Sequence, residues 1–91
     1  MAVAGPVELM ITNRRGLHAR ASARLVTLAS QFAATVYVMK DGQEVLGTSI
    51  MGLLMLGAAM GETIGIRAEG ADAEAALAAL ADLVRSRFGE D

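Results

Sequence analysis

The apolar residues of this 91-residue chain switch back and forth between two spacings. In some stretches they alternate with polar residues at every second position, which is the pattern of a half-buried strand. In others they recur every three or four residues, which is the pattern of a helix with one buried face. Taken in order, the switches predict strand, helix, strand, strand, helix, strand, helix. Such a chain must cover one face of a sheet with its helices, so the predicted fold class is a two-layer α+β sandwich.

The strand spacing occurs in four segments, at residues 7–12, 34–40, 43–47 and 62–69. The second and third are separated only by Asp41 and Gly42, and Asp-Gly between two such runs is typical of a tight β-hairpin. The helical spacing begins at Ala19, begins again after Ser49, and covers residues 72–88. Serine and aspartate are favoured N-cap residues, so we expect Ser49 and Asp72 to begin the second and third helices.

The composition narrows the chemistry that the chain can carry. There is no cysteine and only one histidine, so we expect no disulfide, no metal site and no cofactor. The first residues lack the pattern of a secretory signal, and the longest apolar run, at residues 50–61, is broken by glycines. We therefore expect one cytoplasmic domain, residues 1–91, that does not enter a membrane. The net charge of −2 argues against general nucleic-acid binding.

The single histidine, His18, lies among half of the chain's positive charge. Four of the eight basic residues flank it, namely Arg14, Arg15, Arg20 and Arg24. A histidine at the N-cap of a helix sits where the first backbone N–H groups point outward, and that helix end favours an anion such as phosphate. Arg20, in the first turn, can reach the same anion. A neutral imidazole, helix-end amides and an arginine are the parts that phosphoryl transfer to histidine requires.

Other interpretations of these residues stay open at this point. Residues 18, 21, 25, 28 and 32 lie close to one helical stripe, so a structural, partly buried His18 is an equal alternative. Each arginine taken singly also fits a solvated surface. Ser22 lies near His18, but no acidic residue is placed nearby to orient the imidazole, so a hydrolase triad is poorly supported. A sheet that binds RNA needs aromatic side chains that stack on the bases, and Tyr37 is the only aromatic residue on the predicted strands. The sequence therefore gives little support to an RNA-binding sheet.

Three motifs make the sequence similar to a known family. They are GLHAR at residues 16–20, SIMG at residues 49–52 and AEGADAEAALAALADLV at residues 68–84. With them the chain resembles HPr, the histidine phosphocarrier of the phosphoenolpyruvate-dependent phosphotransferase system, from about residue 7 to residue 88. The resemblance implies an open-faced β-sandwich with strand order 1-4-2-3 and three helices on one side. It also implies a carrier rather than an enzyme.

The same resemblance assigns roles to particular residues. His18 is expected to accept phosphate through Nδ1 from phosphorylated enzyme I and to pass it to an enzyme IIA-type acceptor. Arg20 matches the arginine that steadies the phosphoryl group, and we expect the amide after His18, at Ala19, and Arg24 to contact it as well. Ser49 matches the serine that HPr kinase/phosphorylase phosphorylates in many members. The family motif usually continues with proline, and this chain has Ala21 there.

The short helix after Ser49 is too apolar to be only a surface element. We expect Ile50, Met51 and Leu54 to contact partner proteins, with Leu17 and the aliphatic stem of Arg24 at the rim, because methionine-rich patches suit several partners in turn. Partners are expected to present acidic surface, and association should be sensitive to salt. A carrier with such a face is most simply a monomer.

Two functions from other classes are the alternatives. One is a non-catalytic regulatory module of HPr-like fold, in which His18 is structural. The other is a small ligand- or RNA-binding domain. Within the phosphocarrier interpretation, the acceptor serves either sugar uptake or a nitrogen or metabolic regulatory branch, and the Ala21 departure points to the regulatory branch.

Overall fold

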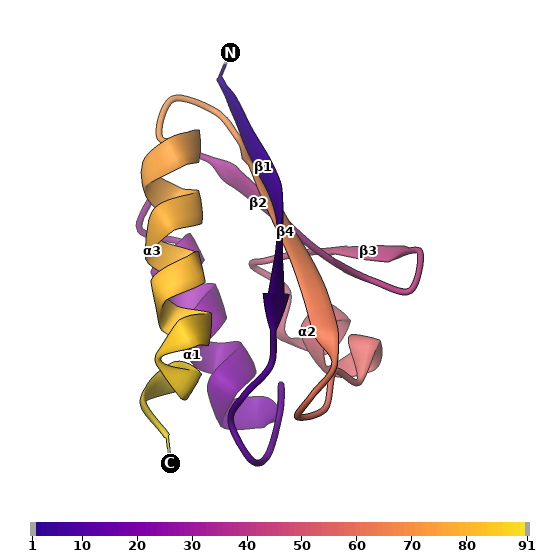
Figure 1. Cartoon of the computed structure of the whole chain (residues 1–91). Helices are drawn as coiled ribbons and strands as arrows, with labels where there is room; N and C mark the ends of the chain where they lie inside the picture. The colour runs from indigo at the N-terminus through magenta and orange to yellow at the C-terminus, as the bar shows by residue number, and fades with distance from the viewer. Residues whose placement is uncertain (1, 91) are drawn as a thin grey trace.

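The computed structural model describes residues 2–90, and over these residues the elements follow the predicted order (Figure 1). The elements are β1 (Val3–Met10), α1 (Ala19–Ala29), β2 (Thr35–Lys40), β3 (Gln43–Leu46), α2 (Ile50–Leu56), β4 (Thr63–Glu69) and α3 (Ala73–Arg85), followed by a short turn, η1 (Arg87–Gly89). The strands form one antiparallel sheet in the order β1-β4-β2-β3. This confirms the α+β class and the strand order.

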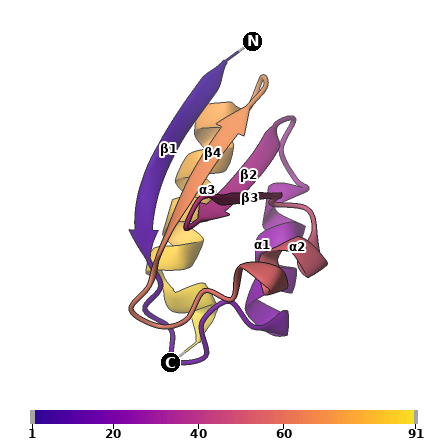
Figure 2. The same cartoon turned by 90° about the vertical axis from the view of Figure 1, so that its right-hand side faces the viewer.

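The helices pack in a layer against this sheet. α1 and α3 lie side by side, and α3 covers β1 and β4 (Figure 1). α2 packs against α1 and against the hairpin of β2 and β3 (Figure 2). None of the helices within residues 2–90 has the length and apolar character needed to cross a membrane.

The first strand begins earlier than its alternation predicted. The expected segment was 7–12, whereas β1 runs from Val3 to Met10. Pro6 lies within this strand although it cannot donate a ladder hydrogen bond. β1 is an edge strand, however, and its register against β4 shifts between Ala4 and Val7, so the proline sits in an irregularity where no donor is needed.

The hairpin of β2 and β3 follows the sequence closely. Lys40 pairs with Gln43 across the turn. Asp41 and Gly42 have φ values of 51° and 81°, which is the left-handed pair that a type I′ turn requires. The predicted hairpin is therefore confirmed at its turn.

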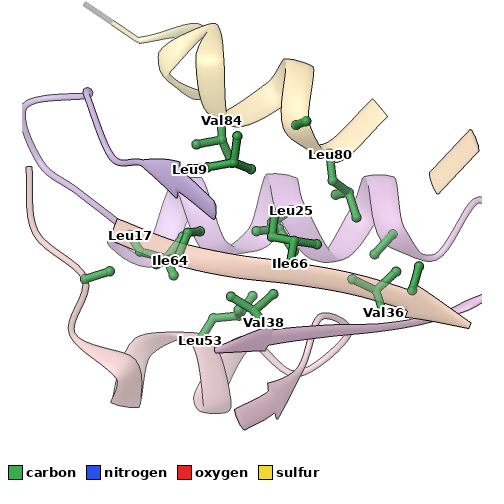
Figure 3. Close-up of a cluster of buried hydrophobic side chains, with 14 of the residues drawn as sticks. Leu9, Leu17, Leu25, Val36, Val38, Leu53, Ile64, Ile66, Leu80 and Val84 are labelled. Carbon is green, nitrogen blue, oxygen red and sulfur yellow. The ribbon is translucent and has the colours of Figure 1, made fainter. Parts of the chain in front are cut away.

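The core lies between the sheet and the helices and is almost entirely aliphatic. Figure 3 shows Leu25 of α1, Ile66 of β4 and Leu80 of α3 pointing into one shared interior, and all three are fully buried. Burying a side chain of this size contributes about 1.5–3 kcal/mol. The largest fully buried side chain is Phe88, which lies beyond the end of α3.

The third helix differs from its prediction at both ends. Asp72 precedes α3 but makes no capping hydrogen bond; its carboxylate accepts from the backbone N–H of Ala33 at 2.8 Å and so fastens the connection between α1 and β2. The helix also ends at Arg85 and not at residue 88, because Arg87 and Phe88 adopt left-handed φ values of 59° and 55°. Phe88 thus reaches the core from a turn.

Candidate functional site

The loop between β1 and α1 places His18 at the end of the molecule where the C-terminal turn also lies. Gly16 has φ +65°, and a Cβ there would lie 2.4 Å from the carbonyl oxygen of Ala58, so only glycine fits. The N–H of Leu17 donates to that same carbonyl at 2.9 Å. Leu17 is only 4% exposed, so the prediction that it lies at the rim of a docking surface is wrong: its side chain belongs to the core.

His18 is the N-cap of α1, as its position before the helical pattern predicted. Its backbone is extended, with φ −74° and ψ −177°, and Nδ1 accepts a hydrogen bond from the N–H of Arg20 at 3.3 Å. The first helical hydrogen bond runs from the N–H of Ser22 to the carbonyl of His18 at 2.8 Å. The hydroxyl of Ser22 is buried and donates to the carbonyl of Leu17 at 3.1 Å, so it is not aligned with the imidazole as a nucleophile.

A carboxylate lies against the other nitrogen of the ring. Nε2 of His18 is 2.6 Å from Oε2 of Glu90, and the two side chains are only 16% and 15% exposed. This overturns the expectation that no acidic residue orients the imidazole. An ionised carboxylate only accepts hydrogen bonds, so Nε2 carries the ring proton. Nδ1, which accepts from the Arg20 N–H, is then left with its lone pair.

Glu90 is itself held by two further contacts. Its Oε1 accepts from the side-chain amide of Asn13 at 3.1 Å, and that buried amide also donates to the carbonyl of Gly16 at 2.7 Å. Burial would raise the pKa of Glu90, but the hydrogen bonds from Asn13 and His18 and the charge of Arg24 outweigh it and leave the pKa below its usual value of 4.5. The carboxylate is therefore ionised at neutral pH.

Arg24 contributes to the same corner in a way that the sequence did not indicate. Its Nη1 donates to the carbonyl oxygen of Phe88 in the C-terminal turn. This contact fixes the C-terminal turn against α1, and the contact of Arg24 with phosphate stays a prediction.

Three arginines form an anion-attracting hollow beside His18. Arg14, Arg15 and Arg20 line it together with Glu90, and its volume is about 350 Å³. Among residues 2–90, none of the ion pairs includes any of these three arginines. Their charges therefore face the hollow and the solvent. The hollow thus presents three positive charges close to Glu90, the carboxylate that contacts the His18 ring.

The exposed side of α2 forms an apolar patch next to α1. We define the α2 patch by four residues with their exposed fractions: Ile50 41%, Met51 68%, Leu54 37% and Met55 77%. The buried residues of this helix are Leu53 and Leu56. Ser49 caps the helix, with Oγ accepting from the N–H of Gly52 at 3.0 Å, as predicted.

Sequence reasoning missed Glu90 and Asn13, which complete the surroundings of His18. Glu90 is 72 positions from His18 in the chain, so no local spacing connects them. The one available sign was Gly89, a residue typical of a helix stop, which indicates that the chain turns before Glu90. Within residues 2–90 there is no cluster of three acidic or histidine side chains that is able to hold a metal ion.

Comparison with known proteins connects this geometry to one family. The family model described as "PTS HPr component phosphorylation site" matches residues 7–86. The chain is 50% identical over 83 residues to the phosphocarrier protein HPr of Neisseria meningitidis serogroup B, covering 91% of this chain and 93% of that protein. It is 42% identical over 92 residues to the phosphocarrier protein NPr of Escherichia coli K12, covering all of both chains.

Solved structures agree with the sequence comparison. The crystal structure of HPr-C-His from Thermoanaerobacter tengcongensis superposes with a TM-score of 0.90 at 43% identity and covers 100% of this chain and 99% of that chain. An HPr from Bacillus anthracis gives a TM-score of 0.86 at 39% identity and covers 92% of this chain and 99% of that chain. The likeness therefore extends over the whole fold.

Proposed function

This chain belongs to the HPr family of phosphocarrier proteins, and from that membership we propose that His18 accepts a phosphoryl group from phosphorylated enzyme I and passes it to an enzyme IIA-type acceptor. Members of the family are carriers of the phosphotransferase system and not enzymes that turn over a small molecule. The phosphoryl group rests on the carrier only between two encounters, so the site has to receive it and release it.

The observation that carries this proposal is the pair of contacts made by the imidazole. Nε2 lies 2.6 Å from the Glu90 carboxylate, which places the ring proton on Nε2, and Nδ1 accepts from the N–H of Arg20 at the beginning of α1, which leaves the lone pair on Nδ1. In the transfer step this lone pair forms the bond to phosphorus, while the bond from phosphorus to the donor breaks and its electron pair leaves with the donor. The reverse exchange, with the next protein as nucleophile, completes the cycle.

Arg20 and the backbone amides at the start of α1 supply the charge that this transfer needs. The N–H of Arg20 already points at Nδ1, and its guanidinium lines the hollow beside the ring. The N–H of Ala19 belongs to the same unpaired helix end, which favours a phosphoryl oxygen. Ala21 keeps the helical backbone that the family's usual proline would also permit in a first turn.

We propose that partners dock on the α2 patch together with the nearby arginines. Ile50, Met51 and Leu54 give an apolar centre, and Arg14, Arg15 and Arg20 give a positive rim that favours acidic partners. Such contacts steer the encounter and weaken as salt is added. The carrier acts as a monomer in the cytoplasm, because a face that must bind two partners in turn has to be free between encounters.

The test is phosphorylation by the protein's own enzyme I and phosphoenolpyruvate, with His18→Ala beside the parent. We expect an acid-labile, base-stable phosphate on the parent and none on His18→Ala, while both proteins give the same folded spectrum. A folded parent that stays unphosphorylated by an active enzyme I would contradict the proposal and favour the regulatory module, in which His18 is structural.

Phosphate transfer from the phosphorylated protein to different enzyme IIA acceptors distinguishes the sugar-uptake branch from the regulatory branch. Relatives named HPr and NPr both match this chain closely, at 50% and 42% identity, so identity does not decide between them. From Ala21 we favour a regulatory acceptor over a sugar-transporting one. Efficient transfer from the phosphorylated parent to a sugar-transporting enzyme IIA, with none to a nitrogen-type enzyme IIA, would reverse this choice.

We also propose that Ser49 is a regulatory phosphorylation site for an HPr kinase/phosphorylase. Ser49 is partly exposed and directly precedes Ile50, the first residue of the α2 patch. A phosphate there adds negative charge to a surface whose partners are acidic, so docking to enzyme I is weakened. Phosphate found by mass spectrometry on the parent but not on Ser49→Ala supports this role, and its absence after incubation with an active kinase contradicts it.

A further inference from the structure

We propose that Glu90 is a positioning residue for the phosphoacceptor: its carboxylate holds the proton on Nε2 of His18 and thereby keeps Nδ1 as the nucleophile. The inference rests on the proposed function of His18. It assigns to the C-terminal turn, whose first residues were predicted to continue the last helix, the task of presenting a carboxylate to the ring.

The turn that carries Glu90 is fixed at three points. Phe88 is fully buried and pins the turn to the core. Arg24 donates to the carbonyl of Phe88 from α1. The N–H of Glu90 donates to the carbonyl of Arg87 at 2.9 Å, which closes the turn on itself. A chain end held only by solvent would not place a carboxylate reproducibly, but this one is anchored to the same helix that begins at His18.

The backbone of the turn is also unusual for its residues. Arg87, Phe88 and Gly89 have φ values of 59°, 55° and 73° in succession. Bulky L-residues rarely occupy this left-handed region, and where they do the surrounding structure enforces it. Without this reversal the chain would continue along α3 and Glu90 would not turn back to His18. The buried phenyl ring of Phe88 supplies the enforcement.

Each oxygen of Glu90 has a separate donor, so the carboxylate is fixed in rotation. Oε1 accepts from the Asn13 amide at 3.1 Å and Oε2 meets Nε2 of His18 at 2.6 Å. The Asn13 amide is in turn fixed by the Gly16 carbonyl at 2.7 Å. Only the Nε2–H form of the ring satisfies Oε2, and only that form leaves Nδ1 free to accept from the Arg20 N–H.

The other charged groups around the ring do not determine which of its nitrogens carries the proton. Arg20, Arg14 and Arg15 line the hollow, and Arg24 faces the C-terminal turn, so each is a donor with no capacity to accept the Nε2 proton. Glu90 is thus the one acidic group in contact with the imidazole among residues 2–90. When Nδ1 bonds to phosphorus, the ring gains positive charge while the Nε2 proton stays against the carboxylate, so Glu90 also stabilises the loaded ring.

The decisive variant is Glu90→Gln, because it keeps the size of the side chain and removes its charge. An amide offers one acceptor and one donor, whereas Asn13 and His18 both present N–H groups. One of the two contacts must therefore fail or reverse, and an amide N–H that faces Nε2 favours the tautomer with the proton on Nδ1. Glu74→Gln is the matched control, since Glu74 is an exposed carboxylate in the first turn of α3.

Two measurements are made on the parent and both variants. Nitrogen-15 NMR of the His18 ring at neutral pH reports which nitrogen carries the proton, and steady-state phosphorylation by enzyme I gives kcat and KM for this protein as substrate. We expect Glu90→Gln to raise the share of the Nδ1–H form and to lower kcat roughly tenfold, the usual size of an orienting partner's effect, with KM changed less than about twofold. Glu74→Gln should match the parent in both measurements.

A ring in Glu90→Gln that keeps its proton on Nε2 as in the parent overturns the inference, and so does an unchanged kcat. A parent that takes up no phosphate contradicts the proposed function instead, and the NMR comparison then still decides whether Glu90 sets the tautomer. Amide spectra of the three proteins establish that the fold is the same in each.

Discussion

His18 and Ser49 occupy the same structural position at the start of a helix and use it differently. The side chain of Ser49 accepts from the Gly52 N–H in the usual capping geometry, so its hydroxyl stabilises α2 directly. Nδ1 of His18 accepts from the Arg20 N–H at a longer 3.3 Å, and this contact lies at the surface of the protein. One cap therefore stabilises its helix, and the other places the ring nitrogen that we propose as the phosphate acceptor at the start of α1.

Removal of the Ser49 cap should lower stability by a predictable amount. We expect Ser49→Ala to reduce the free energy of unfolding by about 1 kcal/mol, because the Gly52 N–H loses its partner. Urea denaturation of both proteins measures the difference. Thr48→Ala, one residue earlier and exposed, is the control and should stay within about 0.5 kcal/mol of the parent. Equal losses for the two variants would contradict the capping role.

At this scale the sequence predicted the position of His18 in the fold but not the residues that surround its ring. The position of His18 before the helical spacing predicted its N-cap role, since capping is a local property of a few consecutive residues. Glu90 and Asn13 were not predicted, because their contacts join opposite ends of the chain. The burial of Leu17 was missed for a related reason: its environment is formed by the loop at Ala58.

At the scale of elements, the C-terminal turn η1 connects the stability of the core to the geometry of the site. α3 stops at Arg85, and the next residues reverse direction so that Phe88 enters the core and Glu90 reaches His18. Arginine and phenylalanine are ordinary helix residues, so the helical spacing of the sequence continued through them. The burial of Phe88 overrides that propensity, which explains why the end of α3 was predicted too late.

The turn should therefore depend on Phe88 more than on any polar contact. We expect Phe88→Ala to lower the free energy of unfolding by about 3–5 kcal/mol, because a fully buried aromatic leaves a cavity. Phe32→Ala is the matched control, since Phe32 is only partly buried at the end of α1, and its loss should be clearly smaller. Urea unfolding measures both. Losses of the same size would mean that Phe88 is not a principal anchor of the core.

At the scale of the whole molecule, the charges are arranged differently on its two sides. The end at His18 carries arginines without ion-pair partners in the described part of the chain. The open face of the sheet carries a closed network in which the guanidinium of Arg67 contacts Glu44 at 3.0 Å and Glu69 at 2.5 Å and lies 3.9 Å from the centre of the Tyr37 ring. The arginines near His18 are therefore free to bind an anion, whereas the charge of Arg67 is already paired with carboxylates.

Acid should weaken the second arrangement, the network around Arg67. The hydrogen bond from Arg67, with burial opposing it and the Arg67 charge adding to it, lowers the pKa of Glu44 below its ordinary 4.5. A lowered folded-state pKa contributes stability above pH 4.5 that disappears as the pH falls through the folded value. We therefore expect Glu44→Gln to be less stable than the parent at neutral pH and the difference to shrink below pH 4.5. Urea titrations at several pH values measure it, and a difference independent of pH would contradict the role of this carboxylate.

The strand order has a consequence for how the chain assembles. β1 pairs with β4 and not with its nearer neighbours, so Val3 finds its partner only at Glu69. The hairpin of β2 and β3, by contrast, closes through a two-residue turn. During synthesis the first strand therefore leaves the ribosome long before its partner exists, and the sheet is completed only when β4 inserts between β1 and β2. Until then the N-terminal strand is an unpaired edge, and it is the segment of the nascent chain that most needs shielding from other chains.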